Sequence, residues 1–461
     1  MKTVMDYFKE ISQIPRCSND EARINEYLMT KAKEWNLEAE TDQALNVLIR
    51  KPGTKGYENK EAVILQGHMD MVCVKEKDSD HDFSTDPLEL ETDGDILYAK
   101  NTTLGADNGI AVAMALKILE DDHLEHPPLE VVITTGEEIG LIGANAMSDQ
   151  WLKGRRMINI DTEEEGVLTV GCAGGVNLHG TLAIEKEEIP GYFYEMEIYG
   201  LPGGHSGMEI HQDIPNGILV LAKMLEKWKE DIYLISFDGG SKHNAIPSEA
   251  KVRFATDHEI QWDDNQWNEW KEKYGDFKGC FKEIDKEKAL DKTQSSNLLG
   301  LIGGLPHGPR GYMTGQYSGI VETSDNFAIV ETKEDEVEFV LSIRSSKKDQ
   351  MDELQKSIEQ ILKNHGASIS TEGSYEPWEF KEDSQLQEIC TQVYKEMFGK
   401  EMEVTVIHAG LECAVFESKY PHLDAVSIGP NMWDVHSPKE RVSLSSVDRT
   451  YDYLVELLKQ L

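Results

Sequence analysis

The chain has 461 residues, with 85 acidic and 46 basic side chains, which gives a formal net charge of −39. That length predicts two or three domains at the usual ~150 residues per domain. A hydrophobic content of 39% indicates a folded protein and not a disordered acidic chain. Because so acidic a surface repels phosphate backbones and anionic lipids, we expect neither nucleic acid nor a membrane surface as a partner.

The N-terminal segment and the cysteines indicate a cytoplasmic protein. The first fifteen residues include Asp6, Lys9 and Glu10, which the apolar core of a signal peptide excludes. Apolar runs elsewhere have the length of strands and fall short of the ~18–20 residues that cross a bilayer. The six cysteines lie far apart without a C-x-x-C pair, which is typical of reduced thiols and not of a disulfide framework.

Short apolar runs alternate with helical periodicity through the first third of the chain and again near its end. Strands are predicted at 62–65, 131–133, 157–160 and 425–428, and helices at 110–119 and about 446–458. Strand–helix–strand alternation of this kind favours an α/β fold with a mostly parallel sheet.

The middle of the chain follows a different pattern. From about residue 185 charged and apolar residues alternate, as at 194–199 and 337–343, which predicts half-exposed strands. Helical periodicity returns at 217–229 and 348–363.

This change of pattern predicts two domains. We expect a discontinuous catalytic domain at residues 1–185 and 377–461, interrupted by an inserted α+β domain at 186–376 that serves as a lid or dimerisation domain. The stretch 257–288 is rich in charge and tryptophan without a clear period, and the sequence gives it no predicted role.

Histidines and carboxylates follow the predicted strands. They are His68 and Asp70 after the first strand, Glu137 and Glu138 after the second, Asp161 after the third, His436 after the strand near the C-terminus, and Asp107 before a helix. Parallel sheets form their ligand crevice at the carboxyl ends of strands, so we expect these side chains to converge. Mixed nitrogen and oxygen ligands suit zinc better than calcium or magnesium, and a carboxylate can bridge two metal ions.

Each of these motifs alone also fits an ordinary structural role. A His-x-Asp pair is typical of a surface or capping pair, and two adjacent glutamates are usually solvated. Asp107-Asn108-Gly109 fits a helix cap or a tight turn. Their joint position at the ends of predicted strands favours a metal-binding site over these separate structural roles.

Several motifs resemble those of a known enzyme family. Leu-Gln-Gly-His-Met-Asp-Met-Val at 65–72, Thr-Leu-Gly-Ala-Asp-Asn-Gly at 103–109 and Gly-Glu-Glu at 136–138 resemble the zinc-site signatures of the co-catalytic metallopeptidases related to glutamate carboxypeptidase and aminoacylase. The segments 159–166, 408–413 and 428–438 resemble, within that family, the bacterial cytosolic aminoacyl-histidine (Xaa-His) dipeptidases. The resemblance extends from the first predicted helix to the last and is weakest at 257–288.

The resemblance implies a ligand set for two zinc ions per chain. One ion would be held by His68 and Asp161 and the other by Glu138 and His436, with Asp107 as the bridging carboxylate. Cobalt or manganese can substitute for zinc in such sites.

The resemblance also implies roles beside the ligands. Asp70 would orient the His68 ring, and Glu137 would be the general base that takes a proton from the attacking water. The peptide bond between Asp107 and Asn108 is expected to be cis.

The inserted domain is expected to complete the site. His205, in a glycine-rich loop, resembles the family histidine that stabilises the oxyanion and contacts the substrate. Asn244 and Arg344 resemble the residues that hold the substrate's free carboxylate, a task for which an arginine fork is well suited. Taken alone, His205 fits an ordinary loop histidine and Arg344 a surface charge.

Three hypotheses follow. The first is a dizinc dipeptidase acting on dipeptides with a free C-terminal carboxylate, including Xaa-His dipeptides such as carnosine. The second keeps the chemistry and changes the substrate to an N-acyl amino acid or an acylated diamino acid. The third is a non-enzymatic binding protein with the same fold, which the presence of Glu137 and all five expected ligands disfavours. Monomer and homodimer both remain open.

Overall fold

The chain folds into two compact units. The computed structural model describes residues 2–461. Unit 1 comprises Met1–Cys172, Trp378–Val406 and Leu411–Leu461, and unit 2 comprises Ala173–Pro377 and Ile407–Gly410. Unit 2 begins before the expected residue 186 because β9 (Gly174–Ala183) pairs along its whole length with β20 (Glu336–Ser345).

Unit 1 is built on an eight-stranded sheet whose centre is parallel. In spatial order its strands are β1 (Glu38–Thr41), β2 (Val47–Lys51), β6 (Leu129–Thr134), β3 (Val63–His68), β7 (Arg156–Asn159), β23 (Asp424–Ser427), β8 (Val167–Cys172) and β22 (Glu403–Ile407). Strands β6, β3, β7 and β23 run parallel, and antiparallel pairs flank them. The α/β class with a largely parallel sheet is confirmed, and the four strands predicted from apolar runs are all present.

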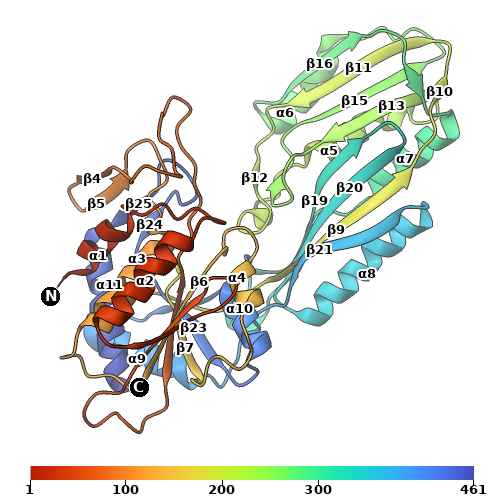
Figure 1. Cartoon of the computed structure of the whole chain (residues 1–461). Helices are drawn as coiled ribbons and strands as arrows, with labels where there is room; N and C mark the ends of the chain where they lie inside the picture. The colour runs from red at the N-terminus through yellow and green to blue at the C-terminus, as the bar shows by residue number, and fades with distance from the viewer. Residues whose placement is uncertain (1) are drawn as a thin grey trace. The chain divides into compact units, whose positions relative to one another are not determined.

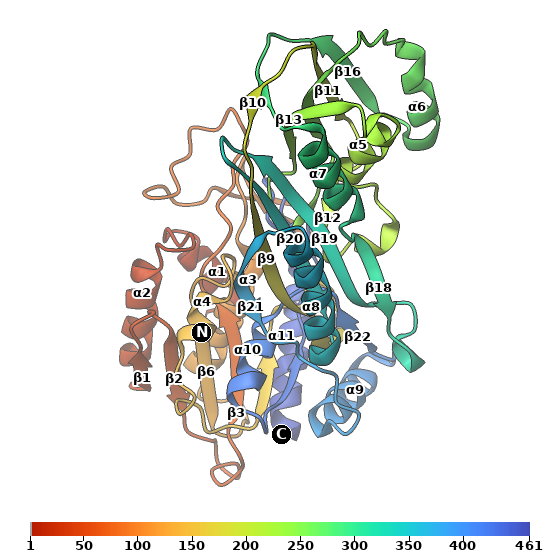
Figure 2. The ribbon, with the colours of Figure 1, turned by 90° about the vertical axis from the view of Figure 1, so that its right-hand side faces the viewer.

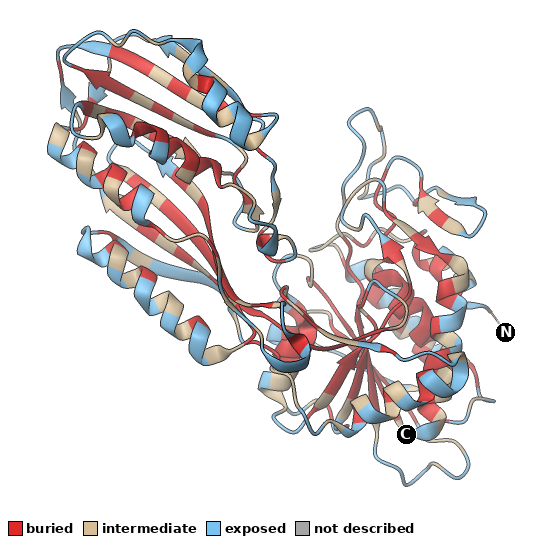
Figure 3. Cartoon of the chain, turned by 180° about the vertical axis from the view of Figure 1, so that it is seen from behind, coloured by how far each residue is buried: buried red, intermediate tan, exposed pale blue. Residues whose placement is uncertain are grey.

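Helices lie on both faces of this sheet (Figure 1). They are α1 (Val4–Ile11), α2 (Ala22–Glu34), α3 (Ala106–Glu120), α4 (Ile142–Ala146), α9 (Gln385–Phe398), α10 (Glu412–Lys419) and α11 (Leu444–Gln460). Every residue of β3 and of β6 is buried, as expected for strands covered on both sides (Figure 3). The helices predicted at 110–119 and 446–458 lie within α3 and α11.

A smaller sheet completes unit 1. Its four strands, in spatial order, are β24 (Met432–Trp433), β25 (Arg441–Ser443), β5 (Ile96–Ala99) and β4 (Leu90–Asp93). The loop between β24 and β25 carries His436, so this sheet fixes both ends of that loop.

Unit 2 is an α+β unit on a nine-stranded, antiparallel sheet. In spatial order the strands are β16 (Lys278–Glu283), β11 (Tyr192–Tyr199), β15 (Ala250–Thr256), β13 (Ile232–Gly239), β19 (Val321–Thr332), β20, β9 and β21 (Ser368–Tyr375), and β18 (Gly308–Tyr312) pairs with β19. Helices α5 (Gly217–Leu225), α7 (Lys292–Gly304) and α8 (Lys348–Asn364) pack on one face (Figure 2). Burial alternates along much of β11 and β15 because that face carries the main core of unit 2, while the opposite face bears a small buried cluster that includes Phe193 and Ala255.

The stretch 257–288 closes one edge of the unit 2 sheet. It contains α6 (Asn268–Tyr274) and the edge strand β16. The Trp262 ring lies 4.7 Å from that of Trp267 and 4.8 Å from that of Phe281, measured between centroids. Trp262 and Trp267 therefore pack in the core of unit 2. Because this packing sets their positions, the segment shows no simple helical or strand period.

Two short antiparallel pairs complete unit 2. They are β10 (Glu187–Glu188) with β17 (Lys288–Ala289), and β12 (Gly204–His205) with β14 (Ala245–Ile246). The second pair carries the predicted site residue His205, and the predicted Asn244 directly precedes β14.

Cys17 and Cys73 form a disulfide, so the expectation that all the cysteines are reduced thiols is wrong for this pair. The two cysteines are 56 positions apart in the sequence, so no local pattern indicates the pairing. Cys17 forms a parallel bridge with Met71, which places the two cysteine Cα atoms 5.7 Å apart. Cys390 and Cys413 are buried thiols.

Across residues 2–461, every helix is too short or too polar to traverse a lipid bilayer.

Candidate functional site

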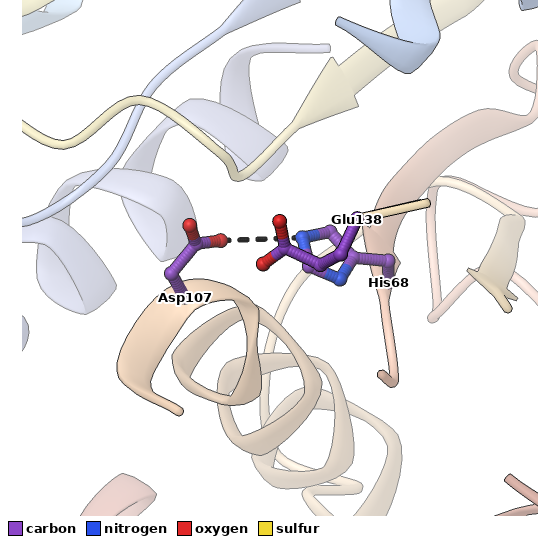
Figure 4. Close-up of side chains that lie close together, drawn as sticks. All are labelled: His68, Asp107 and Glu138. Atoms are coloured by element: carbon purple, nitrogen blue, oxygen red, sulfur yellow. Dashed lines mark hydrogen bonds and ion pairs between the residues drawn. The ribbon is translucent and has the colours of Figure 1, made fainter. Parts of the chain in front are cut away.

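The ends of three parallel strands bring the predicted ligands of unit 1 together. His68 is the last residue of β3, Glu138 follows β6, and Asp161 follows β7. Asp107 lies in the first turn of α3, and His436 comes from the loop after β24. His68, Asp107 and Glu138 each place one ligand atom within 4.8 Å of the others, and Figure 4 shows the three side chains converging.

Asp107 faces both histidines. Its Oδ1 lies 3.2 Å from His68 Nε2, and its Oδ2 lies 3.1 Å from His436 Nε2. Each imidazole also faces a carboxylate of its own: Asp161 Oδ1 lies 3.6 Å from His68 Nε2, and Glu138 Oε2 lies 2.9 Å from His436 Nε2. The five side chains therefore form two groups that share Asp107.

Negative charge is in excess in this cluster. Burial opposes protonation of His68, but Asp161 and Asp107 outweigh it and raise the pKa of the imidazole well above its ordinary value. Burial also opposes charge on His436, yet Asp107 and Glu138 raise its pKa to about 11. The carboxylates around the two imidazoles therefore give this cluster a negative potential that favours a cation.

Glu137 lies beside the cluster. Its Oε2 is 3.9 Å from His68 Nε2. Burial raises the pKa of Glu137, and the charge of His68 opposes that shift. A carboxylate in such surroundings is suited to accepting a proton near neutral pH.

Asp70 holds several parts of the site in place. Its Oδ1 lies 3.3 Å from His68 Nδ1, on the ring nitrogen that faces away from Asp107. It also accepts hydrogen bonds from the backbone N–H of Glu137 (3.1 Å) and of Glu138 (3.3 Å). Asp70 thus fixes the His68 ring and the turn that carries both glutamates.

Glu440 and Arg16, which sequence reasoning missed, fix the turn before Asp107. The Glu440 carboxylate, 2% exposed, accepts four backbone N–H bonds from residues 104–107, at 2.7 to 3.3 Å. Arg16 Nη2 donates to the carbonyl of Gly105 at 2.5 Å. Gly105 has φ 66°, and a Cβ there would lie 2.5 Å from Arg16 Nη2, so glycine is required.

Asn108 connects two of the ligand-bearing strands. The peptide bond before it is cis, as expected. Its Oδ1 accepts the backbone N–H of His68 (3.2 Å), and its Nδ2 donates to the carbonyl of Ile160 (2.6 Å).

The predicted residues of unit 2 belong to a second polar cluster. His205 on β12 pairs with Ala245 on β14, next to Asn244. His205 Nδ1 accepts the backbone N–H groups of Gly207 (3.2 Å) and Met208 (3.0 Å). The proton of a neutral His205 ring therefore sits on Nε2, which makes that nitrogen a donor.

Arg344 on β20 lies in a row of polar side chains, with Ser324 on β19 and Tyr375 on β21. Its Nη1 donates to the hydroxyl of Tyr375 at 3.1 Å, and its buried Nε has no hydrogen-bond partner among the described residues. Opposite Arg344 in the sheet is Ser324, whose hydroxyl lies 2.7 Å from His408 Nε2. Burial, assisted by the charge of Arg344, lowers the pKa of His408 to about 3, so that imidazole is neutral. His408 begins one of the segments that resemble the family, and the sequence alone predicts no role for it.

Comparisons with known proteins agree with this geometry. The family model described as "Peptidase family M20/M25/M40" matches residues 64–460. The chain is 37% identical over 470 residues to the cytosol non-specific dipeptidase of Escherichia coli (strain K12), covering 99% of this chain and 97% of the relative.

Solved structures show the same similarity. The crystal structure of aminoacylhistidine dipeptidase from Vibrio alginolyticus matches with a TM-score of 0.85 and 34% identity, covering 99% of this chain and 96% of that one. Human carnosine dipeptidase 1 matches with a TM-score of 0.52 at 13% identity, covering 99% of this chain and 97% of that one, which is a likeness of fold.

Proposed function

Because the chain belongs to peptidase family M20/M25/M40, we propose that it is a dipeptidase with two metal ions, acting on dipeptides with a free C-terminal carboxylate. Its substrates would include Xaa-His dipeptides. The two relatives with the highest identity described above are named as dipeptidases, which favours dipeptides over N-acyl amino acids or acylated diamino acids. The cytosolic name of the Escherichia coli relative supports a cytoplasmic location.

The observation that carries the proposal is the position of Asp107 between two imidazole–carboxylate groups. His68 with Asp161 would hold one ion, and His436 with Glu138 would hold the other. Asp107, with one oxygen toward each group, would bridge them. The donor set of imidazole nitrogens and carboxylate oxygens fits zinc, and cobalt or manganese would fit the same donors.

The residues around the ions would supply the proton transfers. When bound, two divalent ions acidify water and polarise the scissile carbonyl. Glu137 takes the proton from the attacking water and passes it to the leaving amine. Asp70 keeps the His68 ring and the backbone of Glu137 in place during both transfers.

Unit 2 would bind the parts of the substrate that carry negative charge. His205 Nε2 donates to the oxyanion that develops on the substrate carbonyl. Arg344 and Asn244 bind the free carboxylate, since an arginine offers paired N–H donors to such a group. The donor character of the cluster around Arg344 supports this assignment.

The test combines a metal count with a substrate panel. Purified protein is analysed for bound metal and assayed with glycyl-histidine, carnosine, other dipeptides and N-acetyl-histidine, before and after chelation. We expect two ions per chain, turnover of dipeptides over the N-acyl compound, and loss of turnover on chelation that zinc or cobalt restores. Preferred turnover of N-acetyl-histidine would establish the deacylase instead, and full turnover by metal-free protein would overturn the proposal.

A further inference from the structure

Glu412 is a carboxylate buried in unit 1 that the reaction above does not use. It is the first residue of α10 and is 0% exposed. Its Oε2 accepts hydrogen bonds from Gln66 Nε2 (2.5 Å) and Thr134 Oγ1 (2.6 Å). Its Oε1 is also buried and has no hydrogen-bond partner among the described residues. An anion held only by neutral donors is costly to bury unless positive charge lies nearby.

The partners of Glu412 connect three adjacent parallel strands. Gln66 belongs to β3, and Thr134 is the last residue of β6. Gln66 Oε1 accepts a hydrogen bond from the side chain of Asn159, the last residue of β7, at 2.6 Å. Gln66 and Asn159 also stand opposite each other in the β3–β7 register. A continuous row of side-chain hydrogen bonds therefore crosses β6, β3 and β7 beneath Glu412.

Each strand in this row leads directly to a residue of the proposed metal centre. Gln66 precedes His68 by two residues, and Asn159 precedes Asp161 by two. Thr134 precedes the Glu137–Glu138 pair by three and four residues. The row therefore lies two to four residues before the expected ligands on all three strands. A shift of one strand would move the ligand that follows it.

Glu412 is also within electrostatic reach of those ligands. Burial raises the pKa of its carboxyl to about 7, the charge of His68 lowers it, and Asp161 raises it. Divalent cations bound by His68 and Asp161 would be the positive charge that the buried carboxylate lacks.

We propose that Glu412 is a positioning residue of the metal centre, which holds the ends of β3, β6 and β7 in register and adds negative charge beneath the ligands. The inference rests on the proposed two-metal function. It predicts that Glu412 acts on metal affinity and on the geometry of the bound ion, and not on contact with substrate.

The test compares Glu412→Gln with the wild type. Glutamine has nearly the same shape and can accept both hydrogen bonds through its carbonyl. The change therefore removes the charge and keeps those two contacts, while an NH2 group takes the place of Oε1. Metal affinity is measured by competition with a chelator, and ligand geometry by the visible absorption of the cobalt-substituted protein. We expect metal affinity to fall roughly ten- to a hundred-fold, with an altered cobalt spectrum. At saturating metal, KM for the dipeptide should stay within about two-fold of the wild-type value.

Glu417→Gln is the matched control, since Glu417 lies on the same helix and pairs with Lys381. It should keep wild-type affinity. A second variant, Thr134→Val, keeps the charge and removes one donor, and we expect it to weaken metal binding several-fold. If Glu412→Gln does not fold, as judged by circular dichroism, Thr134→Val decides the question.

Wild-type affinity and an unchanged cobalt spectrum in Glu412→Gln would overturn the inference, as would wild-type affinity in Thr134→Val when that variant alone folds. A wild-type protein that binds no metal would instead overturn the proposed function. The two failures are therefore distinct.

Discussion

The two polar clusters, one in each unit, favour ligands of opposite charge. In unit 1 carboxylates such as Asp107 and Glu138 surround two imidazoles and raise the pKa of His436 to about 11, an excess of negative charge that would favour cations. In unit 2 Arg344 lies with the hydroxyl of Tyr375 and the neutral imidazole of His408, which suits an anion. A chain with a net charge of −39 therefore contains one cluster whose groups would favour a cation and one whose groups would favour an anion. The side chains within each cluster, and not the net charge of the chain, determine which sign of ligand charge the cluster favours.

The largest expected effect concerns the proton acceptor in unit 1. Glu137→Gln keeps the shape of the side chain and cannot accept a proton, so we expect kcat to fall about 10³- to 10⁴-fold with both metal ions still bound. Steady-state kinetics and a metal count on the same sample check this. Glu164→Gln, in an exposed acidic run, serves as the control. Near-normal kcat with two ions bound would remove Glu137 from the mechanism.

Chelation should destabilise one unit and spare the other. Ligands that bind only the folded state stabilise it, by about 4.1 kcal/mol when the free ion is at a thousand times its Kd. We therefore expect metal removal to increase hydrogen exchange in β3, β6 and β7, while the unit 2 strands β19 and β20 keep their protection. Equal loss of protection in both units would show that the metal effect is not local to unit 1.

A buried carboxylate on β19 of unit 2 gives a third test. Burial raises the pKa of Asp325, which is 0% exposed, from 3.8 to about 6, against the opposing charge of Arg310. Because the folded state favours the protonated form, this contribution to stability is complete below about pH 4 and is lost as pH rises through 6. Two pKa units correspond to about 3 kcal/mol. Asp325→Asn should therefore flatten the pH dependence of unfolding between pH 4 and 6.5, measured by denaturant titration. An unchanged slope would contradict the raised pKa.

The smallest expected effect concerns Arg344, which we propose binds the free carboxylate of the substrate. Arg344→Met removes charged hydrogen bonds that are each worth about 1.5–3 kcal/mol, so we expect kcat/KM for a dipeptide to fall roughly 10- to 100-fold. A C-terminally amidated dipeptide should be affected much less, because it lacks the carboxylate. Arg253→Met is the control, since Arg253 pairs with Glu195 and Glu287. Equal losses for both substrates would mean that Arg344 does not recognise the carboxylate.

The convergence of the expected ligands could be predicted because local sequence places most of them just after strands. An apolar run that leads within a few residues to His68 or Asp161 indicates both a strand and the residue near its end. Glu440 and Glu412 could not be recognised in this way, because their hydrogen bonds reach backbone and side chains more than 270 residues away. The Cys17–Cys73 disulfide could not be predicted either, because the two cysteines are 56 positions apart and only the fold brings them together.

The hydrogen bonds of Glu440 have a consequence for synthesis of the chain. They join residues 333 to 336 positions apart, and His436 reaches Asp107 across 329 positions. At about 5–20 residues per second, a ribosome needs roughly 15–55 s to pass from Asp161 to Glu440. During that interval a nascent chain carries His68, Asp107, Glu138 and Asp161 without the groups that complete and order their site. Metal loading is therefore expected to follow synthesis of the last fifth of the chain.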